Sequence, residues 1–74
     1  MKDVLINHEP VELYKILKFE GIVDSGAAAK AVIDEGNVMV NGNVETRRRN
    51  KIKSGDLIEI GGEQYKIVLA TPAA

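Results

Sequence analysis

The stretch Glu35-Gly36-Asn37-Val38-Met39-Val40-Asn41-Gly42-Asn43-Val44-Glu45 contains the boundary between the helical and the extended parts of the chain. Gly36 suits the position just after a helix end, where a left-handed backbone is common. Beyond it apolar residues alternate, and Asn41-Gly42 is a strong signal for a tight two-residue hairpin turn. The stretch therefore predicts a helix that ends near Glu35 and a β-hairpin that follows it.

Two helices are predicted on the N-terminal side of this boundary. The first starts at about Pro10, which fits a first helical position, and ends at Gly21. The second is capped by Asp24 or Ser25 and runs to about Glu35. The residues expected to face the core from these helices are Leu13, Ile16, Leu17, Ala29, Val32 and Ile33.

The remaining segments are predicted to be extended. Residues 4–6 form a short apolar run that suits an edge strand, and residues 57–60 and 64–69 flank Gly61-Gly62 as a second hairpin. Residues 70–74 are expected to be a frayed tail. This order predicts one α+β domain over the whole chain, with two packed helices on one face of a small, mainly antiparallel sheet of two hairpins.

Length and composition exclude several classes of protein. The chain has 74 residues, of which 45% are hydrophobic and 28% charged, as in a soluble globular domain. It contains no cysteine, which excludes disulfides, thiolate metal sites and iron–sulfur clusters. The single histidine, His8, cannot form a multi-histidine metal site, and no apolar run is long enough to span a membrane. We therefore expect a cytoplasmic protein without a cofactor.

The charges are distributed unevenly along the sequence. Residues 47–53, which we call the arginine segment, contain five basic side chains and no acidic one, although the formal net charge of the chain is −1. Residues 1–46 carry four basic and eight acidic side chains, and residues 54–74 carry one and three. Clustered arginines favour a phosphate-rich partner, because the guanidinium group makes planar bidentate contacts with phosphate. The alternatives are a solvated loop or a sheet edge protected by charge.

No constellation of catalytic residues is recognisable in the sequence. His8 has no partner at a spacing that general acid–base catalysis requires, and Ser25 is interpreted as a helix cap. The glycines do not match the spacing of dinucleotide or phosphate-binding loops. Asp34 and Glu35 are adjacent and would point to different sides of a helix, which makes them a poor metal pair. We therefore expect a protein that is not an enzyme.

Four segments together resemble a known family. Residues 12–18, residues 25–30 (S-G-A-A-A-K), residues 35–42 (E-G-N-V-M-V-N-G) and residues 54–60 (S-G-D-L-I-E-I) resemble the RNA-binding domain of ribosomal protein S-four, also called the alpha-L RNA-binding motif. The resemblance covers about residues 11–60. It is closer to the small stand-alone members, the YbcJ-like and YaaA-like proteins, which carry a comparable R-x-R-x-K segment after the hairpin.

The resemblance implies an RNA-binding surface formed by the two helices and the adjacent hairpin. Ser25, Lys30 and Asn41 match the general motif, whereas Gly26 replaces the arginine that is usual in the wider family. The backbone N–H groups of residues 25–27 could still meet a phosphate at the start of the helix. The expected RNA-binding residues are Lys15, Lys18, Ser25, Gly26, Lys30, Asn41, Arg47, Arg48, Arg49, Lys51 and Lys53.

The expected partner is structured RNA, either ribosomal RNA or tRNA, bound by a monomer that acts in ribosome assembly or translation. At least two of the three aromatic residues are expected in the core, so recognition should depend on phosphate contacts and shape. The alternative is a protein-interaction adaptor that uses its acidic body. RNA binding is favoured if Lys15, Lys18, Lys30 and the arginine segment share one continuous face, and the adaptor is favoured if they scatter.

Overall fold

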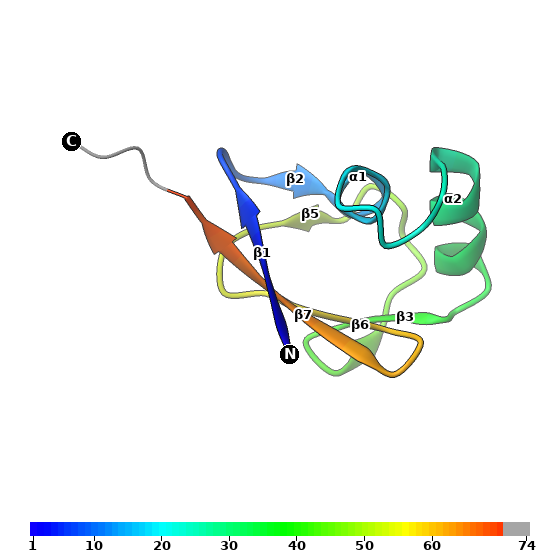
Figure 1. The fold of residues 1–74 in the computed structure, drawn as a ribbon. Coiled ribbons are helices and arrows are strands. Elements are labelled where there is room, and N and C mark those ends of the chain that lie inside the picture. Colours follow the sequence, from blue (N-terminus) through cyan, green and yellow to red (C-terminus); the bar gives the residue numbers. More distant parts are fainter. Residues whose placement is uncertain (71–74) are drawn as a thin grey trace.

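The computed structural model describes residues 1–70 of the chain (Figure 1). Two helices and several short strands form within this part. In chain order the elements are β1 (Lys2–Ile6), β2 (Val11–Glu12), α1 (Leu13–Phe19), α2 (Gly26–Asp34), β3 (Val38–Val40), β4 (Asn43–Val44), β5 (Lys51–Ile52), β6 (Leu57–Ile60) and β7 (Glu63–Leu69).

The main sheet has five strands in the order β1-β7-β6-β3-β4. Neighbouring strands in this sheet pair antiparallel, except that β1 runs parallel to β7. In that parallel pair Val4 lies opposite Ile67. The turn at Asn41-Gly42 joins β3 to β4, and both of its residues have positive φ angles, of 52° and 85°. Both helices lie on the same side of strands β3, β6 and β7 (Figure 1).

The α+β class, with two helices and a mainly antiparallel sheet, is confirmed, but the sheet is larger than predicted. The edge strand β1 joins the C-terminal strand β7 and adds a parallel pair. A second ladder pairs β2 with β5, and it places Val11 opposite Ile52. The prediction of a helix from about Pro10 is therefore wrong by one turn, because Val11 and Glu12 are extended and α1 begins only at Leu13.

The boundaries of α2 follow the sequence signals. Ser25, and not Asp24, is the cap, because its Oγ accepts the N–H of Ala28 at 3.1 Å. The helix ends before Gly36, whose φ of 77° is the left-handed conformation predicted for that position. The N-terminal end of α2 is therefore fixed by a side chain that the sequence identifies as one of two candidates.

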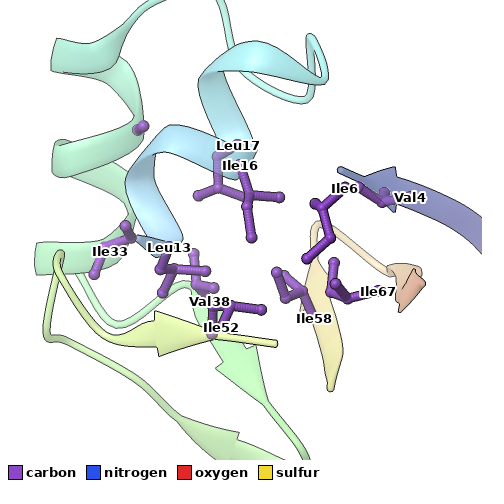
Figure 2. Close-up of a cluster of buried hydrophobic side chains, with 11 residues drawn as sticks. Val4, Ile6, Leu13, Ile16, Leu17, Ile33, Val38, Ile52, Ile58 and Ile67 are labelled. Carbon is purple, nitrogen blue, oxygen red and sulfur yellow. The ribbon is translucent and has the colours of Figure 1, made fainter. Parts of the chain in front are cut away.

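The core lies between the helices and the sheet. Leu13, Ile16 and Leu17 of α1 point toward aliphatic side chains from the strands (Figure 2). α2 contributes Ala29 and Ile33, whereas Val32 is only half-buried. The buried residues of the strands are Val4, Ile6, Val38, Ile52, Ile58 and Ile67. Five of the six predicted core positions on the helices are therefore confirmed as buried: Leu13, Ile16, Leu17, Ala29 and Ile33. Their close packing holds both helices in place on the sheet.

The end of the described chain is held to β1. The N–H of Ala70 donates to the carbonyl oxygen of Ile6 at 2.7 Å, so Ala70 does not belong to a frayed tail. The other residues of the predicted tail, 71–74, lie outside the described residues.

Candidate functional site

The backbone of the arginine segment supplies the cap of α1. Glu12 occupies the N-cap position of this helix but makes no side-chain capping bond. Instead, the N–H of Leu13 donates to the carbonyl oxygen of Asn50 at 2.9 Å, and the N–H of Tyr14 donates to that of Arg48 at 3.1 Å. These bonds satisfy two of the N–H groups that a helix leaves free at its start. They also fix the arginine segment against α1.

Arg48 connects this segment to the second helix. Its guanidinium group makes a bidentate contact with Asp34, the last residue of α2, in which Nε lies 2.9 Å from Oδ1 and Nη2 contacts Oδ2. The same contact holds the pKa of Asp34 below its ordinary value, because the hydrogen bond from Arg48 stabilises the carboxylate. Arg48 is thus directed onto the surface shared by both helices.

Glu12 is the centre of a second group of cations. Lys15 Nζ lies 2.9 Å from Glu12 Oε1, and Arg49 Nε lies 3.7 Å from Glu12 Oε2. Lys51 is the cross-strand partner of Glu12 in the β2–β5 ladder. The Glu12 side chain is only 17% exposed. Its pKa is lowered chiefly by the hydrogen bond from Lys15, with smaller contributions from Lys51 and Arg49. The Glu12 carboxylate therefore pairs with two cations, and Lys51 lies opposite it in the ladder.

Tyr14 lies between cations from the two helices. Lys30 Nζ of α2 is 5.2 Å from the centre of the Tyr14 ring, and Lys15 Nζ of α1 is 6.0 Å from it. Both distances fall in the range of cation–π contacts. The ring therefore joins the cations of α1 to those of α2.

Lys18, a residue of α1, lies beside the start of α2. A β-carbon added at Gly26 would lie 3.6 Å from Lys18 Cδ, so the lysine stem passes the first residue of α2 at a distance that leaves room for a side-chain carbon. One turn further along α2 is Lys30, and one turn beyond that is Asp34, the partner of Arg48. The lysines of α1 therefore lie beside the row that Gly26, Lys30 and Asp34 form on α2.

These contacts connect six cations that the sequence analysis selected separately. We call them the cationic face, and they are Lys15, Lys18, Lys30, Arg48, Arg49 and Lys51. These contacts link the three lysines with Arg48, Arg49 and Lys51 of the arginine segment, whereas Arg47 and Lys53 lie outside them. This arrangement favours the RNA-binding hypothesis over the adaptor. A concentrated cationic surface of this kind attracts polyanions even when the net charge is near zero.

The other selected residues lie around this face. Arg47 pairs with Glu45 next to β4, through a bond of 2.9 Å between Nη2 and Oε1, and this bond lowers the pKa of Glu45. Lys53 follows β5 and borders a shallow groove with Glu9 and Pro10. The Ser25 hydroxyl caps α2.

Asn41 has a structural role in the hairpin. Its Nδ2 donates to Asp56 at 3.1 Å, and its Oδ1 accepts the N–H of Leu57 at 2.9 Å. The side chain therefore fastens the β3–β4 turn to the start of β6.

Sequence reasoning did not select Glu12, Tyr14 or Asp34 for the site. Tyr14 is adjacent to the core residue Leu13 and is half-buried. From the sequence it is therefore interpreted as a residue next to the core, and its contact with Lys30 is not predicted. Glu12 precedes Lys15 by three residues, and this spacing is a recognisable signal for an ion pair. Asp34 and Arg48 are 14 residues apart, and no local pattern links them.

Two kinds of feature are absent from residues 1–70. No helix in this range is both long and apolar enough to cross a membrane. The same residues contain no group of three or more His, Asp or Glu side chains that could hold a metal ion.

Comparison with known proteins identifies the family of this chain. The family model described as S4 domain matches residues 4–68. The chain belongs to the S4 domain family. This match spans both helices and all the cations of the cationic face.

Two curated relatives are similar to this S4 domain over most of their length. YbcJ of Escherichia coli (strain K12), named an RNA-binding protein, is 48% identical over 61 residues, which are 82% of this chain and 87% of the relative. RlbA of Bacillus subtilis (strain 168), named a probable ribosome maturation protein, is 36% identical over 59 residues, which are 80% and 83% of the two chains.

Two solved structures share the fold of this S4 domain. The solution structure of Escherichia coli YbcJ, described as revealing an alpha-L motif involved in RNA binding, has a TM-score of 0.70 and 43% identity, and the match covers 92% of this chain and 87% of that one. The 30S ribosomal protein S4e from Thermoplasma acidophilum has a TM-score of 0.68 and 27% identity, over 80% of this chain and 31% of that one. The fold of this S4 domain therefore matches the alpha-L fold of YbcJ, and a similar fold occurs within the longer protein S4e.

Proposed function

We propose that this S4 domain binds structured RNA, either ribosomal RNA or tRNA, through the cationic face and without catalysis. The observation that carries the proposal is the arrangement of four cations, Lys15, Lys30, Arg49 and Lys51, around Glu12 and Tyr14. Arg48 on Asp34 and Lys18 beside the start of α2 extend this group. Phosphate groups along an RNA backbone are the anions that match a row of lysines and arginines. We propose that the chain acts as one monomeric domain in the cytoplasm.

The geometry favours recognition by shape and backbone over reading of sequence. The Arg48 carbonyl is hydrogen-bonded to Tyr14 of α1, and Glu12 holds Lys15 and Arg49, so these cations are positioned before RNA binds. A pre-organised row of cations selects a phosphate spacing and leaves base edges unread. Structured RNA, in which phosphates have fixed positions, therefore suits this surface better than a flexible strand.

The relatives support this proposal and indicate a process. YbcJ is named for RNA binding, and RlbA is named for ribosome maturation. We propose that the RNA bound by this chain belongs to the translation machinery, in ribosome assembly or in translation itself.

Salt dependence tests the basis of binding. If about four to six phosphates are neutralised, the logarithm of the association constant should fall with the logarithm of salt concentration with a slope of about 3 to 5. The measurement is a titration of a structured RNA hairpin at several salt concentrations. A slope near zero would contradict phosphate contact.

A matched pair of double variants locates the site. Lys15→Ala with Lys30→Ala removes two charges from the cationic face, whereas Lys2→Ala with Lys66→Ala removes two charges from β1 and β7. We expect the first variant to weaken binding at least tenfold and the second to change it by less than about twofold. Equal effects would move the site away from the cationic face. If both double variants then still bound a basic protein partner, the adaptor, which uses the acidic body, would be favoured.

A further inference from the structure

An apolar groove of about 440 Å³ lies on the side of α1 that borders β1. Such a volume is within the range of small-molecule sites. Its main lining residues are Leu5, Val11, Lys15, Ile16 and Phe19, with Asn7, His8 and Glu20 as polar groups. Apart from Lys15, the lining residues lie outside the cationic face.

Two of the lining side chains are exposed to an unusual degree for their type. Phe19 is 68% exposed and Leu5 is 61% exposed. The other two aromatic residues, Tyr14 and Tyr65, are partly buried against the core, so Phe19 is the most exposed aromatic ring among the described residues. Large apolar side chains that are exposed together in a groove indicate a binding site.

The groove is continuous with the cationic face. Lys15 belongs to both, because it lines the groove and pairs with Glu12 through its ammonium group. Lys18 belongs to the face, and its Nζ lies 5.5 Å from the centre of the Phe19 ring. A ligand in the groove would therefore have two cations at the border of its site.

We propose that the groove takes one unpaired base of the RNA whose phosphates contact the cationic face. This inference rests on the proposed function and deepens it, because it names the kind of RNA: a helix interrupted by a bulged or looped-out nucleotide. The positive charges of Lys15 and Lys18 at the border of the groove indicate which ligand it takes. A nucleotide combines a flat apolar base with a phosphate, and here an open aromatic ring lies beside Lys18 and Lys15.

The polar groups of the groove suit the edges of a base. Asn7 and His8, which contact each other at 2.9 Å between Oδ1 and Nδ1, offer donors and acceptors. Glu20 offers acceptors to an exocyclic amino group. The stacking surface and the hydrogen-bonding groups are therefore both present, as unpaired bases require in protein–RNA complexes.

Two synthetic hairpins test the proposal. They share one stem, and one of them carries a single bulged adenosine. We expect the natural protein to bind the bulged hairpin about tenfold more tightly, and Phe19→Ala to remove that preference while it leaves binding of the plain hairpin unchanged. Val44→Ala is the control, because Val44 is 61% exposed but lies on β4, outside the groove.

A spectroscopic measurement separates stacking from a general loss of affinity. The chain has no tryptophan, so Phe19→Trp introduces a single tryptophan, which can be excited at wavelengths where the two tyrosines do not absorb. We expect the bulged hairpin to quench its emission and the plain hairpin to leave it unchanged.

The outcomes distinguish this inference from the proposed function. If both hairpins bind equally, and Phe19→Ala changes neither, the groove does not take a base, although phosphate binding stands. If neither hairpin binds, both proposals fail. A different outcome is that the groove binds an apolar peptide in the same assay, with Phe19→Ala abolishing peptide binding and leaving the binding of both hairpins unchanged. In that case the partner of the groove is a protein, and the base-binding inference is overturned.

Discussion

The N–H of Tyr14 donates to the carbonyl oxygen of Arg48 across 3.1 Å, and this bond attaches the arginine segment to the first turn of α1. The side chains of the same two residues extend toward α2, where Tyr14 contacts Lys30 and Arg48 contacts Asp34. A capping bond, which is usually a matter of helix stability, here also determines where the cations lie.

Removal of the carboxylate that holds Arg48 should strengthen RNA binding. Asp34→Asn removes a negative charge from the cationic face and frees Arg48 for a phosphate. We expect a severalfold gain in affinity at low salt, measured by titration with a structured hairpin. Glu35→Gln is the matched control, because Glu35 follows Asp34 and contacts Asn37 instead of an arginine. A loss of affinity in Asp34→Asn would show that the ion pair positions Arg48 for binding.

Opposite charges at the start of α2 should have opposite effects. A side chain at position 26 has room, since its Cβ would meet only Lys18 Cδ at 3.6 Å. Gly26→Glu should weaken RNA binding about tenfold, and Gly26→Arg should strengthen it. A glutamate also suits a helix N-terminus, so the weaker binding would not reflect unfolding. The measurement is a titration of one RNA against both variants, with thermal unfolding as a check. If both bind as the natural protein does, this end of α2 does not face RNA.

Asn41 should contribute to stability more than to RNA affinity. Asn41→Ala removes the bonds to Asp56 and Leu57 and puts alanine at a φ of 52°. We expect the free energy of unfolding to fall by about 1–3 kcal/mol, because the Leu57 N–H loses its acceptor and the turn is strained. Urea unfolding measures the loss. If the folded variant also bound RNA more weakly, the role that the family resemblance implies for Asn41 would be restored.

The protein should lose stability in acid. The carboxyl groups whose pKa is lowered by hydrogen bonds in the folded state are Glu9, Glu12, Asp34 and Glu45. Their contribution to stability is fully present above their unfolded pKa values of about 4, and it is lost as the pH falls through the lower, folded values. The thermal midpoint should therefore drop as the pH falls below about 4. Glu12→Gln with Asp34→Asn should reduce that drop. A midpoint that is constant across this range would contradict the pairings.

The local signals in the sequence predicted the parts of the fold that depend on nearby residues. Asn41-Gly42 and Gly36 predicted a turn and a helix end because both positions need left-handed backbone, which these residues tolerate. The ladder of β2 and β5 gave no such signal. Each of these two strands has only two residues, too few to show an alternating pattern. The buried residue of the ladder, Ile52, stands within a charged segment of the sequence.

The candidate site was predicted as a set of cations but not as an arrangement. Arginines in a row are visible in the sequence, whereas their carboxylate partners depend on tertiary contacts. Glu12 meets Arg49 only because β2 pairs with β5, and Asp34 meets Arg48 only because the arginine segment caps α1. Phe19 was overlooked for the same reason, since an aromatic residue at helical spacing gives no indication of whether another element covers it.

The position of β7 between β1 and β6 has a consequence for the order in which the domain can form during synthesis. β1 is made early but has its sheet partner in β7, which emerges from the ribosome after every other strand. Until then Val4 and Ile6 have no partner strand, and the edge of β6 that β7 later covers is open to other chains. A nascent chain that stalls before residue 63 therefore keeps both surfaces exposed, and completion of the sheet is a late, long-range event.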